Sequence, residues 1–284
     1  MVARALLDEL TYGGVSRRER PVASHVPYTR HVDDNIIKTR DGLVLTILKL
    51  DGYSFETSDM SEVNSRLLGR NDVIRTLANS RFALAAHIVR REVQPRIEST
   101  FDNPLCRELD ERYDAALSQR RMFVNDIYLT IVRRPLQGQA GTFDVMLTRL
   151  LGRKDEAGES VAVQTALTEL RDAATAVREN LAGYGARQLG VVRREGVWFS
   201  EPLEFLVQLI NGGLPRPMHL PRMNIADALS MKRIFFGRNA IEIRGAGPED
   251  TRFGAMVSIR EYPAQTGPGS FDNLLRVPHE FIAT

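Results

Sequence analysis

The pattern of hydrophobic and polar positions predicts strands first, then helices alternating with strands, and a hairpin-rich end. Apolar runs at 36–38 and 43–50 flank Arg40-Asp41-Gly42. An Asp-Gly pair between two such runs predicts a β-hairpin. The run from Phe82 to Val89 is apolar at both alternating sets of positions, which predicts a strand buried on both faces that Arg90-Arg91 leads out to solvent. Alternation over 127–132 predicts a further strand that ends before Pro135.

Helices are predicted where apolar residues recur every three or four positions. Asp59 and Glu62 resemble a capping box before one such segment, whose apolar residues are Val63, Leu67, Ile74 and Leu77. Asn103 as a cap and Pro104 in the first turn predict a second helix. Its expected buried stripe consists of Leu105, Leu109, Tyr113 and Ala116. Further helices are predicted at 143–151, at 159–181 and from Ser200 onward.

The last third predicts a hairpin at 234–243, a third strand at 253–259 with one wet face, and a short helix and connector after 271. Together these elements predict an α+β fold of mixed or antiparallel sheets with packed helices, in one or two subdomains. We expect a flexible arm at 1–26, an α/β subdomain at 27–152, and a helical then hairpin-rich subdomain at 153–284. The charged loop at 152–158 is the expected boundary.

Composition places the chain among soluble globular proteins. Of its 284 residues, 43% are hydrophobic and 26% charged, which excludes a disordered tail, a collagen-like chain and a disulfide scaffold. The longest apolar stretches are far shorter than the roughly 18 residues of a membrane helix, and the N-terminus lacks the order of a signal peptide. A cytoplasmic protein is therefore expected. The net charge of +2 does not demand a nucleic-acid partner.

A Walker A loop is excluded by the lysines. That loop needs a lysine directly after a glycine. The chain has four lysines, and none follows a glycine (Lys38, Lys49, Lys154 and Lys232). The glycine-rich stretch Gly267-Pro268-Gly269-Ser270 has no lysine behind it, and Pro268 lacks a backbone N–H, so it is interpreted as a turn.

Other catalytic and metal-binding patterns are equally weak. No two of the five histidines have the spacing that places two metal ligands on one helix face. His31 lies near Asp33 and Asp34, which suggests either a metal site or, as we favour, a solvated loop. The single cysteine, Cys106, is interpreted as a half-buried thiol in preference to a reactive one. No catalytic, nucleotide-binding or metal-binding residue is assigned, and the residues that bind a partner or membrane are left open.

Several segments, taken together in their order and spacing, resemble the N-terminal half of the CagE–TrbE–VirB family. That family comprises the large cytoplasmic ATPases of bacterial type IV secretion systems, and the resemblance covers residues 25–284. The segments that carry it are PYTRHVDDN at 27–35, LDGYSFE at 50–56, HIVRR at 87–91, NDIYLT at 125–130, YGARQLG at 184–190, EIRG at 242–245, RFGAM at 252–256, EYP at 261–263 and EFIAT at 280–284. Ala85 and Arg133 depart from the family pattern, which usually has aromatic residues there.

The resemblance implies a non-catalytic part of a secretion motor in a conjugation or protein- or DNA-export system. The family's Walker motifs lie beyond its N-terminal half, so ATP and magnesium are expected only in a C-terminal P-loop domain that this sequence lacks, and no catalytic residue is transferred. The implied role is docking of the ATPase to other secretion subunits at the inner membrane, together with self-association. The implied location is cytoplasmic and peripheral to the bacterial inner membrane.

Three arginine pairs give this implied role candidate contacts. Arg90-Arg91, Arg133-Arg134 and Arg193-Arg194 either meet anionic lipid head groups or acidic partner tails, or are ordinary charged strand ends. Two other functions stay open: a nucleic-acid-binding module, which rests on the arginines alone, and a standalone enzyme with an unrecognised site. The sequence does not determine the cargo or the oligomeric state.

Overall fold

The computed structural model of the chain describes residues 20–53, 58–78, 81–94, 100–134, 156–261 and 276–284. Contacts divide the chain into two compact units, each made of two separate segments. The first combines Met1–Leu45 with Leu189–Met256, and the second combines Thr46–Gln188 with Val257–Thr284. The predicted boundary between 152 and 153, the predicted helix at 143–151 and most of the predicted arm lie outside the described residues. The proposed subdomain division therefore stays a prediction.

The first unit begins with a short 3-10 turn (Val22–Ser24) and the strands β1 (Tyr28–Asp33) and β2 (Ile36–Thr39). The predicted hairpin between β2 and β3 (Val44–Leu50) is confirmed, with Lys38 opposite Val44. Gly42 has φ +80° in its turn, a conformation that glycine adopts without steric cost. β1 was predicted as a polar loop, and this was wrong. It pairs antiparallel with β2, and two register shifts explain why its sequence shows no clean alternation.

In the second unit, the strand order continues from β3 to β5 (Met122–Arg133), then β4 (Phe82–Val93) and then β12 (Phe281–Ala283). The short strand β6 (Arg187–Gln188) also pairs with β3. β4 and β5 are antiparallel over their whole length, from Phe82 opposite Arg133 to Val93 opposite Met122. The expectation that β4 is buried on both faces was wrong, because Leu84 is 37% exposed. The expected connector at the end of the chain instead forms β12, which pairs antiparallel with β4.

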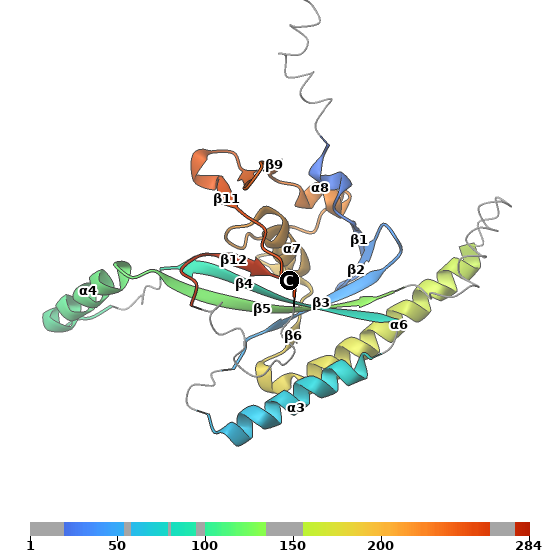
Figure 1. Cartoon of the computed structure of the whole chain (residues 1–284), viewed down its shortest axis with the longest axis horizontal. Helices are drawn as coiled ribbons and strands as arrows, with labels where there is room; N and C mark the ends of the chain where they lie inside the picture. Colours follow the sequence, from blue (N-terminus) through green and yellow to red (C-terminus); the bar gives the residue numbers. More distant parts are fainter. Residues whose placement is uncertain (1–19, 54–57, 79–80, 95–99, 135–155, 262–275) are drawn as a thin grey trace, which may run out of the picture. The chain divides into compact units, whose positions relative to one another are not determined.

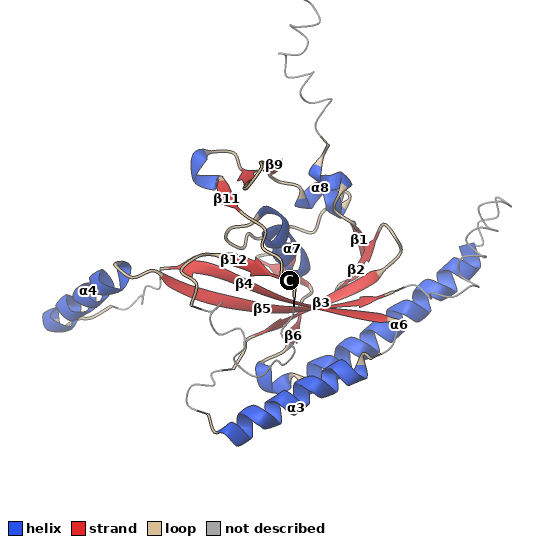
Figure 2. Ribbon diagram, in the orientation of Figure 1, coloured by secondary structure: helices blue, strands red, loops and turns tan. Residues whose placement is uncertain are grey.

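Two long helices pack together in the second unit (Figure 2). α6 (Glu156–Asn180) confirms the helix predicted at 159–181, and it lies against α3 (Met60–Thr76) and β5. Their shared core consists of almost fully buried side chains (Val73, Leu77, Ile131, Leu167, Leu170 and Val177). The predicted capping box of α3 was wrong, because Asp59 makes no side-chain cap and Glu62 accepts a hydrogen bond from Arg66. Ile74, one of the apolar residues whose spacing predicted this helix, is 55% exposed.

A third described helix of the second unit, α4 (Pro104–Ser118), lies beyond the end of the β4–β5 hairpin (Figure 1). Its predicted start is confirmed, because the Asn103 side chain accepts a hydrogen bond from the backbone N–H of Leu105 at 2.9 Å. None of its residues is buried. The predicted buried stripe of this helix was therefore wrong, a result that bears on the candidate site.

The rest of the first unit contains the hairpin of β7 (Val191–Arg194) and β8 (Val197–Ser200), α7 (Glu201–Asn211) and α8 (Ile225–Leu229). The predicted start of α7 is confirmed, with Ser200 Oγ accepting from the N–H of Leu203. β9 (Arg233–Phe236) and β10 (Ile241–Arg244) form the predicted hairpin. The third strand, β11 (Arg252–Gly254), is shorter than expected. The antiparallel sheets with packed helices confirm the α+β class.

Candidate interaction site

The first predicted arginine pair lies within the second unit instead of at its surface. Arg90 is only 7% exposed; its guanidinium lies 4.4 Å above the Phe123 ring and donates to the Asn125 side chain and the Val277 carbonyl. Arg91 forms an ion pair with Asp126 at 2.7 Å. β4 continues beyond both residues, so the expectation that they lead the chain out to solvent was wrong.

In the second pair, Arg133 is buried and Arg134 is exposed. Arg133 has a side chain only 5% exposed, and its Nε lies 2.6 Å from Glu169 on α6. Arg81 binds the other oxygen of the same carboxylate at 2.8 Å. The hydrogen bond from Arg133 holds the pKa of Glu169 below its usual value, against the opposing effect of desolvation. Glu169 therefore ties the end of the β4–β5 hairpin to α6.

Both residues of the third pair are exposed. Arg194 forms an ion pair with Glu204 on α7 at 2.7 Å, and Arg193 donates to the Gly196 carbonyl at 3.4 Å and lies 5.9 Å from the Trp198 ring centre. Five of the six arginines are thus engaged with carboxylates or carbonyls of the chain itself. These contacts reduce the number of free cations that the pairs offer to lipid, acidic tails or nucleic acid, and both alternatives for their role stay predictions.

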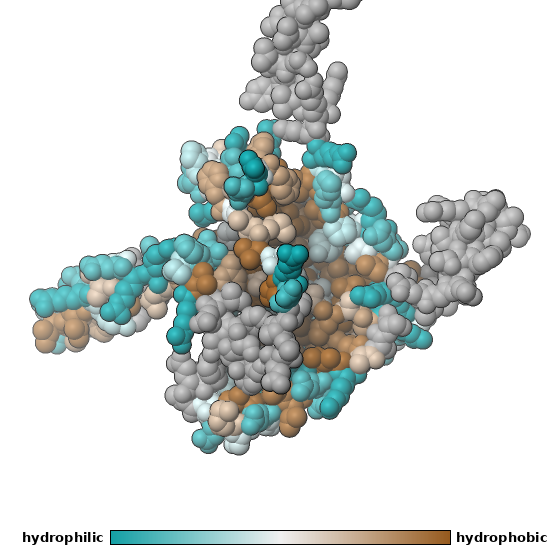
Figure 3. Space-filling model, viewed as in Figure 1, coloured by the Kyte–Doolittle hydropathy of each residue, from teal (hydrophilic) through white to brown (hydrophobic). Residues whose placement is uncertain are grey.

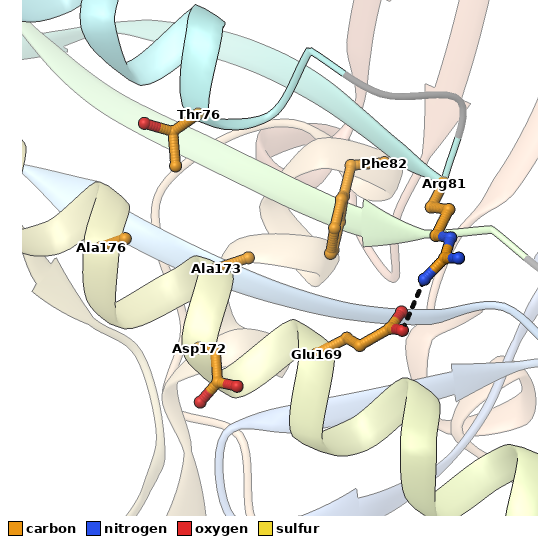
Figure 4. Close-up of a pocket in the computed structure, with 7 residues that line it drawn as sticks. All are labelled: Thr76, Arg81, Phe82, Glu169, Asp172, Ala173 and Ala176. Carbon is orange, nitrogen blue, oxygen red and sulfur yellow. Dashed lines mark hydrogen bonds and ion pairs between the residues drawn. The ribbon is translucent and has the colours of Figure 1, made fainter.

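The second unit has an open groove on its surface (Figure 4). It has a volume of about 610 Å³ and lies between the end of α3, the start of β4 and α6. Its lining residues are Thr76, Arg81, Phe82, Glu169, Asp172, Ala173 and Ala176. The Thr76 hydroxyl donates to the Asp72 carbonyl, and Glu169 is already paired with two arginines. The Thr76 hydroxyl and the Glu169 carboxylate are therefore already engaged within the fold.

The first unit contains one serine–histidine contact that superficially resembles a catalytic pair. His31 Nε2 lies 2.9 Å from Ser200 Oγ, and His31 Nδ1 lies 3.3 Å from the Asp33 backbone carbonyl. Ser200 is fully buried, and its hydroxyl also caps α7. A nucleophile must reach its substrate, so this pair stabilises the fold instead of acting in catalysis. Burial lowers the pKa of His31.

The same contacts bear on the metal hypothesis for His31. Both of its ring nitrogens have protein partners, and one Asp33 carboxylate oxygen accepts from the N–H of Asp34. Within the ranges that the structure describes, no group of three or more potential ligands is placed to hold a metal ion. Cys106, expected to be half-buried, is exposed.

The most unusual surface feature is an apolar stripe on α4. Leu105, Leu109 and Tyr113 are 72%, 69% and 53% exposed, and their spacing places them on one side of the helix. Figure 3 shows hydrophobic residues along one edge of α4 and hydrophilic residues along the other. We call these three side chains the α4 stripe. The sequence pattern identified its residues correctly, but amphipathic spacing alone does not reveal whether a stripe faces the chain's own core or a partner.

The first unit also exposes hydrophobic side chains. Phe236 on β9 and Phe253 on β11 are 77% and 75% exposed, and Met256 is 86% exposed. Large exposed apolar side chains that gather in one region mark protein interaction sites. No helix among the described residues is both long and apolar enough to cross a membrane.

Comparison with known protein families assigns the chain to a class and then to a family. Residues 35–140 match the N-terminal domain of the type IV secretion system ATPase VirB4/TrbE. Residues 187–284 match the CagE, TrbE, VirB family, described as a component of the type IV transporter system. Both family descriptions are of type IV secretion proteins, and together the two matches cover most of the chain. The chain belongs to the CagE, TrbE, VirB family, as the resemblance in its sequence predicted.

Individual relatives agree with this assignment. The chain is 32% identical to the type IV secretion system protein virB4 of Bartonella quintana (strain Toulouse) over 95% of its own length and 34% of the relative. It is 28% identical to protein virB4 of Rhizobium radiobacter, over 96% and 34% of the two chains. It is 27% identical to the type IV secretion system protein PtlC of Bordetella pertussis (strain Tohama I / ATCC BAA-589 / NCTC 13251), over 97% and 33%. The chain spans about a third of the length of these curated relatives.

Proposed function

We propose that this chain is the non-catalytic N-terminal domain of a type IV secretion ATPase, which docks the motor to inner-membrane secretion components and supports its oligomerisation. The observation that carries the proposal is the match of residues 35–140 to a family's N-terminal domain. Exposed hydrophobic side chains on both units, among them Leu105 and Phe253, agree with a role in binding other proteins. The proposed location is the cytoplasmic face of the inner membrane.

The proposal assigns the chemistry of the motor to another part of the protein. ATP and magnesium would bind a P-loop, and no lysine of this chain follows a glycine. We therefore expect the 284-residue chain to release no phosphate from ATP above the level of a mock purification. Turnover that persists in a clean preparation would contradict the non-catalytic role.

Docking is tested directly with membranes. The purified chain is mixed with inverted inner-membrane vesicles from cells that carry the corresponding secretion system, and with vesicles from cells that lack it. We expect the chain to sediment with the first vesicles and to stay in solution with the second. Equal behaviour with both would overturn docking to secretion components. Sedimentation equilibrium of the chain alone tests self-association.

A further inference from the structure

The strand β4 has one edge that is only partly covered. β5 pairs with one edge along the whole strand, whereas β12 pairs with the other edge only at residues 88–90. Figure 1 shows the C-terminus beside the middle of β4, and the strand extends beyond it toward its own start. No strand among the described residues pairs with this second edge at residues 82–86. We call this stretch the open β4 edge.

Backbone hydrogen bonding determines which groups face the open β4 edge. The N–H of Arg134, next to β5, donates to the Arg81 carbonyl at 2.6 Å, so the backbone of Arg81 faces β5. Bonded and non-bonded pairs alternate along an antiparallel ladder, and the register of β4 with β5 contains no shift. The N–H and C=O groups of Leu84 and Ala86 therefore face the open β4 edge.

The sequence of this edge is typical of a strand that another strand covers. Exposed edges pair with other chains, and proteins protect them with charged residues, proline or bulges, or by covering them. Residues 82–86 contain no charged residue and no proline, and they pair with β5 without a bulge. Leu84 is 37% exposed, although Ile131 opposite it on β5 is fully buried. Of the usual devices, only a cover remains for this edge.

The register of β12 indicates which segment supplies that cover. β12 runs antiparallel to β4, and directly after it the Thr284 hydroxyl lies 3.3 Å from His87 Nδ1. In the same register, the first and third residues after Thr284 would lie opposite Ala86 and Leu84. Both are bonded positions of the ladder, so the two strands would exchange backbone hydrogen bonds there.

We infer that the polypeptide following Thr284 continues β12 as a strand along the open β4 edge, in the manner of strand addition to a sheet. An apolar side chain at its third residue would cover Leu84. The inference rests on the proposed function, which places a motor domain after this chain, and the chain spans about a third of the length of its relatives. The motor would then be joined to the docking domain through a strand of its sheet instead of a flexible linker.

Hydrogen exchange tests the inference by comparing the 284-residue chain with the full-length protein that its gene encodes. Mass spectrometry with single-residue fragmentation measures the amides of Leu84 and Ala86. We expect them to exchange at least about tenfold more slowly in the full-length protein. The amides of Ala83 and Ala85 face β5 and should exchange slowly in both. Equal exchange of Leu84 and Ala86 in the two proteins would overturn the inference.

Two matched proline variants of the full-length protein test the register. Proline at the third residue after Thr284 removes the N–H that would donate to Leu84, so we expect the protection of Leu84 to be lost. Proline at the second residue removes an N–H that would face away from β4, which an edge strand tolerates, and protection should persist. Slow exchange at Ala83 and Ala85 would show that both variants fold. Equal exchange of Leu84 in the two variants would contradict pairing in this register.

Other outcomes separate this inference from the proposed function. Protection of Leu84 and Ala86 in the 284-residue chain that increases with protein concentration would assign the edge to a second copy and overturn the inference. A gene that continues into a P-loop domain, with Leu84 and Ala86 still unprotected, would overturn the inference and leave the docking role intact. A gene that stops at Thr284 would refute the proposed motor and the inference together.

Discussion

At the scale of single residues, several buried polar side chains in this protein have specific partners from other parts of the sequence. His87 lies between Thr130 and Thr284, and Lys232, with a side chain 5% exposed, binds Asp250 at 2.8 Å. The hydrogen bond from Lys232 lowers the pKa of Asp250. Because an unpaired buried polar group is costly, these contacts hold the fold together and are unavailable to partners.

Acidification is expected to destabilise the fold through its buried histidines. Burial lowers the pKa values of His31 and His87 in the folded state below the value of about 6.5 in the unfolded state. The unfolded chain therefore binds protons first as the pH falls below about 6.5, and the free energy of unfolding decreases. Urea denaturation between about pH 7 and pH 5.5 should show this decrease. It should be smaller in His87→Asn, and an equal decrease in the variant would contradict the assignment.

Glu169 is expected to contribute to stability because it neutralises a buried guanidinium. Glu169→Gln leaves the almost fully buried Arg133 without a carboxylate, so we expect a loss of about 2 kcal/mol in the free energy of unfolding. Asp72→Asn breaks the exposed pair with Arg75 and should change this free energy by less than about 0.5 kcal/mol. Urea denaturation at neutral pH measures both. Equal effects would show that burial of the Arg133 pair is energetically unimportant.

At the scale of elements, a side-chain N-cap begins both α7 and α4, but the two helices differ in how much they bury. Ser200 caps α7, which buries Leu203, Phe205 and Leu206, whereas Asn103 caps α4, which buries no residue. A cap contributes to global stability only where the helix unfolds together with the core. The two helices therefore allow a direct comparison.

Ser200→Ala should lower the free energy of unfolding by about 2 kcal/mol, because it removes the cap of α7 and the hydrogen-bond partner of His31. Asn103→Ala should change the global value by less than about 0.5 kcal/mol. It should instead accelerate hydrogen exchange of the α4 amides, measured by mass spectrometry. A large global effect of Asn103→Ala would mean that α4 is coupled to the core.

At the scale of the whole molecule, contacts of the arginines with other groups of the chain bear on the binding of nucleic acid. A nucleic-acid interface needs free cations along the backbone path, and binding then weakens steeply with salt. Arg90, Arg91, Arg133 and Arg194 are held by groups of the chain itself. We expect no saturable binding of a labelled single-stranded oligonucleotide at about 50 mM salt. Salt-dependent binding under these conditions would revive the nucleic-acid hypothesis.

The sequence by itself determined the local elements, the α+β class and the family. Asp41-Gly42, Asn103-Pro104 and Ser200 act through hydrogen bonds and dihedral preferences within a few residues, so their effects are visible in a short window. The ordered family segments likewise need no coordinates.

Only the tertiary structure decided which amphipathic faces are covered and which charges are free. The spacing of Leu105, Leu109 and Tyr113 is that of a core stripe, yet these side chains are exposed because α4 lies at the end of a hairpin whose strands pair fully from Phe82 to Val93. In the sequence, Arg90 and Arg133 look like solvated strand ends. In the structure, Arg90 lies over the Phe123 ring and Arg133 pairs with Glu169, and each partner is more than 30 positions away. β1 and β12 depend on pairing with strands that local propensity does not specify. Burial is a property of neighbours brought together by the fold, and a periodic pattern records only which side of an element is apolar.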